Sequence, residues 1–361
     1  FEVLSANMEE VLVAVTAKAI ADTSNKDYVA LAIESNGRFA KDKDIDVSRT
    51  VGWFTSIYPL VLKAGADPVR HLCYVKEKRR KIKDIEYSFN IAASGLEGIF
   101  VRPQISFNYL GEIEDSEGSF NMVNMPCGSA VGSDISRDYA VDISCKIIEK
   151  EDNKKLHFTI AYSNSVVDEA WAVSLKKSLT NTIYDYISAI SLDDNKKIST
   201  PSDYGLDIGI DEMQYLEAIY GNQSEDYVKM TPMQKGMLYH VVSNPDDDAN
   251  YERLKMKISG DFSLELLQKA LIIVQKKYPT LRTAFVNDNI SEPVQVILKK
   301  GITDIELVDG REMTSSEIDD IKSSFDRKPF VPGKGNLSGL LLIQVGGDSY
   351  EVIWRFHHLI L

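Results

Sequence analysis

The stretch SYEVIWRFHHLIL, residues 349–361, alternates apolar side chains with others and then presents two adjacent histidines. Every second position from Tyr350 to Phe356 is apolar, which predicts a strand with one face in a core. His357 and His358 follow on opposite sides of the chain, so they cannot share one role. A histidine at a strand exit suits general-base chemistry, because imidazole titrates near neutral pH. Spacing alone leaves a catalytic and a structural role equally open.

The composition is that of an ordinary globular protein, with 361 residues, 44% hydrophobic and 26% charged. This length suggests two domains. The net charge of −13 argues against a nucleic-acid binder, and the basic run KEKRRKIK (76–83) is interpreted as a solvated face or a loop. No apolar run is long enough to span a membrane. Three cysteines without C-x-x-C spacing indicate neither zinc nor disulfides, which favours a reducing, cytoplasmic location.

Helical and strand-like segments alternate along the chain, which predicts an α/β (α+β) fold in two lobes. The stretch 171–187 carries apolar residues four apart, so we expect a long helix whose stripe packs on the sheet of its own lobe. A polar segment with Pro201 and Gly205 marks a break. We therefore predict a first lobe over 1–195, a linker with a short helix over 196–226, and a second lobe over 227–361.

Two segments that end predicted strands carry candidate site residues. ESNGR (34–38) follows a strand and offers Glu34 as an acid or base and Arg38 as an anion clamp, although a surface ion pair at a turn is the alternative. SFNYLG (106–111) puts Asn108 and Tyr109 on opposite faces of a strand end, where Tyr109 alone is more typical of a core. The sequence shows no Ser/His/Asp arrangement, glycine-rich phosphate loop or metal-ligand cluster.

Three motifs of the first half resemble those of nonribosomal peptide synthetase epimerization domains. DVSRTVGWFTSIYP (46–59), centred on Trp53, is close to their D-I-S-R-T-V-G-W-F-T-S signature. ESNGR before it is similar to E-G-H-G-R, and FNYLG (107–111) after it matches F-N-Y-L-G. Residues 1 to about 195 therefore resemble the C-terminal lobe of an epimerization domain.

The second half resembles the N-terminal part of a condensation domain. TPMQKGMLYH (231–240) and KYPTLRTAF (277–285) look like the first two motifs, and HHLIL (357–361) matches the first five positions of H-H-x-x-x-D-G. The form YVKMTPMQKGMLYH is similar to condensation domains that follow an epimerization domain and accept a D-configured donor. This resemblance implies two chloramphenicol acetyltransferase-like lobes, each a mixed β-sheet covered by helices.

The resemblance also implies a chemistry for the first half. Epimerization inverts Cα of an aminoacyl or peptidyl thioester held on the 4'-phosphopantetheine arm of a peptidyl carrier protein. Glu34 would be an acid/base group, while Arg38, Asn108 and Tyr109 would position the arm or stabilise charge. We expect Glu34 and Tyr109 to point into a common cleft, and Trp53 to be structural within its motif. No cofactor would bind directly, and the partners would be carrier-protein and neighbouring synthetase domains, with no nucleic acid and no membrane.

In the second half, the resemblance assigns a catalytic role to His358. It would accept or orient the proton of the attacking amine during peptide-bond formation, while His357 would pack or form hydrogen bonds. Arg282 is expected to be a structural partner for a carboxylate. Since the motif stops before its Asp-Gly, we expect His358 to lie near a frayed end, out of working geometry.

Departures from the family pattern leave alternatives open. Ser35 and Asn36 replace a glycine and a histidine of E-G-H-G-R, and KIKDIEYS (81–88) has Asp84, Glu86 and Ser88 where the family has glycines. Both active sites would be incomplete in this fragment, which would then be inactive by itself. One rival interpretation is a non-catalytic docking piece for carrier proteins. Another is a stand-alone acyltransferase of the chloramphenicol acetyltransferase type, against which the tandem order and the linker count.

Overall fold

The structure is a computed structural model that describes residues 5–38, 46–83, 89, 102–114, 128, 132, 135–150, 153–191, 198–244 and 247–361. The chain divides into two compact units, Phe1–Ser199 and Thr200–Leu361. The stretch KIKDIEYS lies outside the described residues from position 84 onward. The predicted boundary at residue 195 is close to this division.

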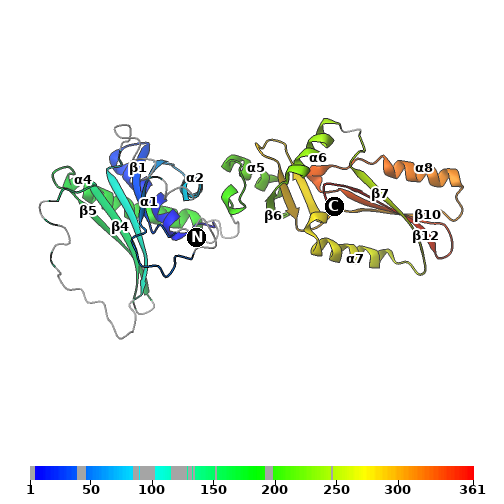
Figure 1. The fold of residues 1–361 in the computed structure, drawn as a ribbon, viewed down its shortest axis with the longest axis horizontal. Coiled ribbons are helices and arrows are strands. Elements are labelled where there is room, and N and C mark those ends of the chain that lie inside the picture. The colour runs from blue at the N-terminus through cyan, green and yellow to red at the C-terminus, as the bar shows by residue number, and fades with distance from the viewer. Residues whose placement is uncertain are drawn as a thin grey trace. The chain divides into compact units, whose positions relative to one another are not determined.

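The first unit packs helices on one face of a sheet (Figure 1). Its elements are α1 (Met8–Ser24), β1 (Tyr28–Ser35), β2 (Ser56–Lys63), α2 (Pro68–Lys83), β3 (Ile105–Glu114), β4 (Val141–Lys150), β5 (Asn153–Tyr162) and α4 (Glu169–Ser191). The strand order is β2-β1-β3-β4-β5, with β1, β3 and β4 parallel and both outer pairings antiparallel. The prediction of a mixed sheet covered by helices is confirmed for this unit.

Alternation in the strands decides which face of this sheet is buried. Leu31, Ile33 and Phe107 are 0% exposed, and α1 contacts the strands that carry them. On the opposite face Val61 is 57% exposed and Ala30 is exposed. The apolar side chains at every second position therefore place the core between the sheet and α1.

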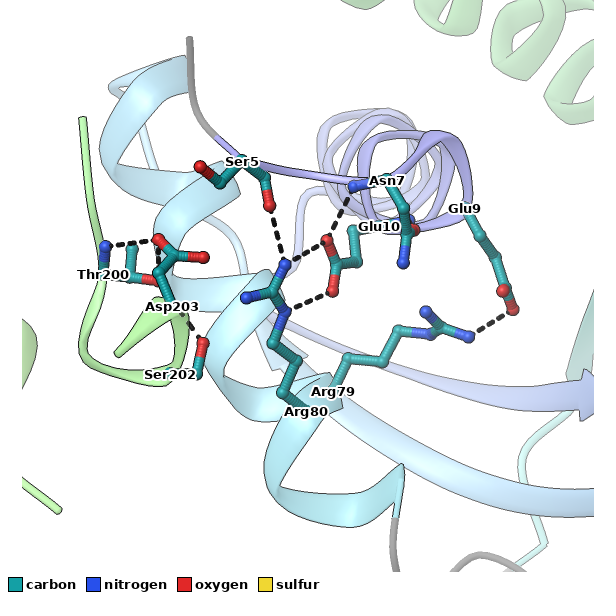
Figure 2. A network of polar contacts seen from close by, with 9 residues as sticks. All are labelled: Ser5, Asn7, Glu9, Glu10, Arg79, Arg80, Thr200, Ser202 and Asp203. Carbon is teal, nitrogen blue, oxygen red and sulfur yellow. Dashed lines mark hydrogen bonds and ion pairs between the residues drawn. The ribbon is translucent and has the colours of Figure 1, made fainter. Parts of the chain in front are cut away.

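The beginning of α1 is tied to α2 by a buried carboxylate (Figure 2). Glu10 is 1% exposed, closes a capping box with Asn7, and accepts a hydrogen bond from Arg80 Nε at 2.7 Å. Arg79 pairs with Glu9 beside it. These arginines belong to the basic run 76–83, so the expectation of a loop is wrong, and a solvated face is present at Lys78 and Lys81 but not at buried Lys76. The run forms the second half of α2. Its arginines are held against the start of α1 because they pair with Glu9 and Glu10.

The long helix predicted at 171–187 is α4, and its expected packing needs a correction. Leu175 and Leu179 are buried, whereas Ile187 is 46% exposed. Most contacts of α4 are with α1, and only a few are with β5. The stripe thus packs on a helix rather than on the sheet, because α1 already covers the central strands.

The second unit contains two sheets. Its elements are η3 (Pro201–Asp203), α5 (Ile210–Tyr220), β6 (Ser224–Lys229), α6 (Pro232–Ser243), β7 (Tyr251–Ser259), α7 (Leu264–Lys277), η4 (Pro279–Arg282), β8 (Thr283–Val286), β9 (Val294–Leu298), β10 (Asp304–Asp309), α8 (Ser315–Asp326), η5 (Pro332–Lys334), β11 (Ser338–Gln344) and β12 (Ser349–His357). The strand orders are β10-β11-β12-β7 and β6-β9-β8. The first of these sheets is mixed, since only β10 and β11 run parallel.

Helices α7 and α8 cover opposite faces of the β10-β11-β12-β7 sheet (Figure 1). Leu267 and Leu271 of α7 pack on Val352, while Phe325 of α8 packs on Ile353. A separate core lies under the short β6-β9-β8 sheet and includes residues of the segment expected as a linker: Leu206, Ile208, Met213 and Leu216. Much of 196–226 is therefore part of the second unit's core, because its helix α5 is amphipathic.

Candidate functional site

Strand register brings two predicted site residues of the first unit together. Glu34 on β1 is the register partner of Asn108 on β3, and the same row continues to Ser144 on β4. Register partners project to the same side of a sheet. Their neighbours Ile33 and Phe107 face the core, so Glu34 and Asn108 lie on the face away from α1, where both are partly exposed.

Tyr109 lies on the other face of the sheet. It follows Asn108 directly, so its side chain alternates to the side of Phe107, and its register partner Cys145 is 1% exposed. Burial, followed by the charge of Glu112, raises the pKa of the Tyr109 hydroxyl. The expectation that Glu34 and Tyr109 share a cleft is therefore wrong, because adjacent residues of a strand point to opposite sides.

A second polar row lies two residues back along the same face. Ser106 Oγ donates a hydrogen bond to Asp142 Oδ1 at 2.6 Å, and Arg137 forms an ion pair with the other carboxylate oxygen. Sequence reasoning missed this group. Its signal was the alternation of SFNYLG (106–111), which places Ser106 on the same face as Asn108. The face that carries Glu34 is thus polar over neighbouring rows of the sheet.

Arg38 is used to hold a loop. Its Nη1 donates to the carbonyl oxygens of Val47 at 2.9 Å and Thr50 at 2.8 Å, and its guanidinium lies 4.3 Å from the centre of the Phe54 ring. Gly37 has φ +62°, and a Cβ there would lie 1.6 Å from Phe54 O. Glycine at 37 and arginine at 38 therefore fix the tryptophan-centred motif against the end of β1.

The loop that Arg38 holds presents apolar side chains on its surface. Trp53 is 87% exposed and Val51 is 99% exposed. A tryptophan in such a position contributes little to the packing of its own unit. The structural role expected for Trp53 has no support in contacts within the described residues of the first unit.

In the second unit, His357 is completely buried at the end of β12. Its Nδ1 accepts a hydrogen bond from the Leu359 N–H at 3.0 Å, and the Tyr251 ring stands edge-on at 5.2 Å between centroids. Burial, then the charges of His358 and His240, lower its pKa to about 4. His357 is thus neutral at pH 7 with its proton on Nε2, which has no hydrogen-bond partner among the described residues.

His358 is held on the surface beside the same strand. Its backbone N–H donates to Asn250 O at 2.9 Å, and its Nε2 lies 3.2 Å from Glu252 Oε1. The side chain is 40% exposed. His357 therefore faces the interior and His358 faces outward.

The residues after the histidine pair are packed. Leu359 is 2% exposed and Ile360 is 1% exposed, within a core cluster that includes Phe285 and Phe356. The Thr280 hydroxyl also donates to Ile360 O at 2.7 Å. The expectation of a frayed end around His358 is therefore wrong, because apolar side chains and backbone hydrogen bonds anchor both sides of it.

Arg282 is buried under the short sheet. It is 5% exposed and donates to Gln275 O at 3.2 Å and to Leu298 O. Its guanidinium also binds the Glu225 carboxylate, with Nη1 to Oε2 at 2.8 Å and Nη2 to Oε1 at 3.1 Å. Within the described residues, Glu225 is the carboxylate that Arg282 meets, and the two carbonyl groups tie η4 to α7 and to β9.

Metal-ligand clusters and membrane-spanning helices are both absent from the described residues. In the parts of the chain that the structure describes, no three histidine, cysteine, aspartate or glutamate side chains are grouped as metal ligands. The helices described there also include none with the length and hydropathy that a membrane crossing needs.

Comparison with known proteins gives consistent family matches. A family model described as "Condensation domain" matches residues 2–204 and 224–361. Bacitracin synthase 3 of Bacillus licheniformis is 25% identical over 353 residues, covering 94% of this chain and 6% of that protein. Bacitracin synthase 1 of the same organism is 26% identical over 374 residues, covering 100% of this chain and 7% of that protein. The chain thus spans only a small part of these curated relatives.

One solved structure among the matches is the epimerization domain from the third module of tyrocidine synthetase B. It aligns with a TM-score of 0.46 and 26% identity, over 52% of this chain and 43% of that one. The crystal structure of a four-domain nonribosomal peptide synthetase aligns with a TM-score of 0.36 and 18% identity, over 38% of this chain and 11% of that chain.

Proposed function

Because this chain belongs to the condensation-domain family, we propose that it is part of a nonribosomal peptide synthetase that epimerizes a carrier-bound residue and then forms the next peptide bond. The substrates are aminoacyl or peptidyl thioesters on the 4'-phosphopantetheine arms of peptidyl carrier proteins. Residues 227–361 are the condensation part and residues 1–195 the epimerization lobe. The motif resemblances and their tandem order support this assignment.

The observation that carries the condensation proposal is the contrast between the two histidines. His357 is buried and neutral, with Nδ1 occupied by a backbone N–H. His358 is partly exposed at the end of the same strand, where a substrate can reach it. A general base must come within about 3 Å of the proton that it accepts. Of the two, His358 is the one that offers its imidazole to an incoming amine.

The proposed reaction balances through His358 alone. The acceptor amine attacks the thioester carbonyl as His358 takes its proton, so a C–N bond forms and the C–S bond breaks. The pantetheine sulfur leaves as a thiolate and receives the proton from His358. The imidazole thus returns to its starting state, and no cofactor is consumed.

For epimerization, we propose that Glu34 exchanges a proton with Cα of the thioester. The α-proton of a thioester is acidified, but the enolate still needs a base on one face and an acid on the other. Asn108 lies beside Glu34 in register and has an amide that can donate to the enolate oxygen. Arg38 contributes by fixing the loop next to Glu34, and Tyr109 has no part in this step because it lies on the other face of the sheet.

The direct test uses the full-length synthetase with both carrier proteins loaded. His358→Ala should slow peptide-bond formation by roughly a hundredfold or more, since general-base catalysis typically contributes that much. His357→Ala is the matched control, because it removes the adjacent imidazole and should act through folding stability. Near-normal condensation by a folded His358→Ala enzyme would contradict the proposal and favour a docking role.

A second test addresses Glu34. Glu34→Gln should sharply reduce exchange of the Cα proton of the carrier-bound thioester, measured by deuterium incorporation. Glu112→Gln is the control, since Glu112 is an exposed carboxylate on the neighbouring strand that pairs with Lys154. Equal exchange rates in both variants would show that Glu34 is only a surface carboxylate.

A further inference from the structure

We propose that Glu252 is a positioning residue for His358: its carboxylate accepts a hydrogen bond from Nε2–H and leaves Nδ1 as the basic nitrogen of the ring. This inference rests on the proposed function of His358. Glu252 belongs to none of the motifs that carry the family resemblance, and no role follows for it from that resemblance.

The geometry comes from the pairing of two neighbouring strands. Glu252 is the register partner of Phe356, and Tyr251 is the partner of His357, where β7 begins and β12 ends. The backbone of His358 is fixed to the same segment through Asn250 O at 2.9 Å. Glu252 Oε1 then lies 3.2 Å from His358 Nε2. Backbone pairing on both sides of the contact holds the two side chains within reach.

This contact determines which nitrogen of the His358 ring carries hydrogen. An ionised carboxylate only accepts hydrogen bonds, so Nε2 must carry hydrogen when it binds Glu252. In a neutral imidazole the other nitrogen is then unprotonated. The nitrogen that accepts the amine proton is therefore Nδ1, and the imidazolium that forms is stabilised by the adjacent carboxylate.

Glu252 is also among the residues that border a cleft of the second unit. The cleft has a volume of about 690 Å³, and Asp248, Tyr251, Asp326 and Arg355 also line it. Arg355 is 3% exposed and donates to the carbonyl oxygens of Phe325 (at 2.7 Å), Asp326 and Lys328. These bonds fix the C-terminal end of α8 as a wall of the cleft. Tyr251 and Arg355 lie on the His357 side of the sheet, whereas Glu252 pairs with Phe356 on the other side, and His358 is not among the residues that line the cleft. The positioning role therefore rests on the direct contact between Glu252 and His358.

The first experiment reads the tautomer of His358 in the 361-residue chain by two-bond ¹H–¹⁵N NMR of ¹⁵N-histidine protein above neutral pH. The signal is assigned by its loss in His358→Gln. Wild-type protein should show hydrogen on Nε2. Glu252→Lys should invert this to Nδ1, because an ammonium group only donates and needs Nε2 as acceptor. Both side chains are partly exposed, so the variant should fold.

Asp248→Lys is the matched control. It makes the same change of charge in the same cleft, but no hydrogen bond connects Asp248 with His358 among the described contacts. Its His358 should keep the wild-type tautomer. An unchanged tautomer in Glu252→Lys, or an equal change in both variants, would overturn the proposal.

Activity of the full-length synthetase separates this inference from the function on which it rests. Glu252→Gln should lower the maximal condensation rate by about two- to fivefold with little change in KM, since water screens a partly exposed pair. Glu252→Asp should recover part of the rate. If the tautomer responds as expected but His358→Ala condenses normally, the proposed function fails. If His358→Ala is inactive but the tautomer of His358 is the same in wild-type and Glu252→Lys protein, only the positioning role fails.

Discussion

His71 in the first unit and His357 in the second are buried imidazoles with very similar properties. They are 2% and 0% exposed, and burial is the largest cause that lowers the pKa of each to about 4. The Nδ1 atom of His71 shares a hydrogen bond with the Tyr186 hydroxyl, whereas that of His357 accepts from a backbone N–H. Of the two histidines, only His357 lies next to a residue with a proposed catalytic role, His358.

The causes behind the two pKa values differ in an informative way. The backbone of Lys63 partly offsets the effect of burial on the pKa of His71. For His357, the charges of His358 and His240 reinforce that effect. A buried histidine with a lowered pKa is therefore not a mark of catalysis in this protein. What distinguishes His357 is that its Nδ1 fixes the backbone immediately after His358.

The largest expected effect is a loss of stability in acid. The folded pKa of each histidine, about 4, lies below the unfolded value of 6.5. As pH falls, the unfolded chain therefore binds the proton first, so the contribution is complete above pH 6.5 and disappears by about pH 4. Each histidine should account for up to about 3 kcal/mol of this loss. Urea unfolding at several pH values, followed by hydrogen exchange in each unit, measures it.

His71→Asn and His357→Asn isolate these contributions from those of the carboxylates. Asparagine offers an oxygen near the position of Nδ1 and does not titrate. Each variant should flatten the pH dependence of its own unit between pH 6.5 and 4 and leave the other unit unchanged. A variant with the wild-type pH dependence would show that the histidine is not held neutral by the fold.

The second prediction concerns the tyrosine beside His71. Tyr186→Phe removes the hydroxyl that hydrogen-bonds Nδ1 and leaves a buried nitrogen without that partner. We expect the first unit to lose about 1–3 kcal/mol, the usual cost of a buried polar group that loses its hydrogen bond. Hydrogen exchange of α4 amides at pH 7 reports it. Unchanged protection of α4 would mean that the contact contributes nothing to holding α4 against α2.

The sequence predicted the parts of the molecule that depend on local pattern. Alternation in residues 350–356 predicted a strand with one face in a core, and the strand is β12. Both of its faces are buried, however, because α7 covers Val352 and α8 covers Ile353. The same reasoning put Asn108 and Tyr109 on opposite faces, and the structure agrees. Expecting Tyr109 to meet Glu34 ignored that rule, because the resemblance grouped residues by motif and not by strand side.

Contacts between distant segments could not be predicted from local pattern. Nothing in KEKRRKIK indicates that Arg80 meets Glu10, 70 residues away. The local sequence around Glu225 does not predict its contact with Arg282. Likewise, the sequence around Glu252 does not predict its contact with His358. Each pair is created by the pairing of helices or strands. Side chains that hold a site in place are therefore harder to find from sequence than the motif residues that they hold.

The smallest expected effect is that of Tyr251→Phe in the second unit. Tyr251 contacts His357 and stacks on Phe330 through its ring, with centroids 5.2 Å apart in both cases and nearly parallel planes in the second. Phenylalanine keeps that ring, so the free energy of unfolding should change by less than about 0.5 kcal/mol. Tyr186→Phe makes the same chemical change beside the other histidine, where the hydroxyl is the contact. Urea unfolding of both variants at pH 7 compares them directly. Equal losses would mean that Tyr251 also acts through its hydroxyl, and the two histidines would then be held in the same way.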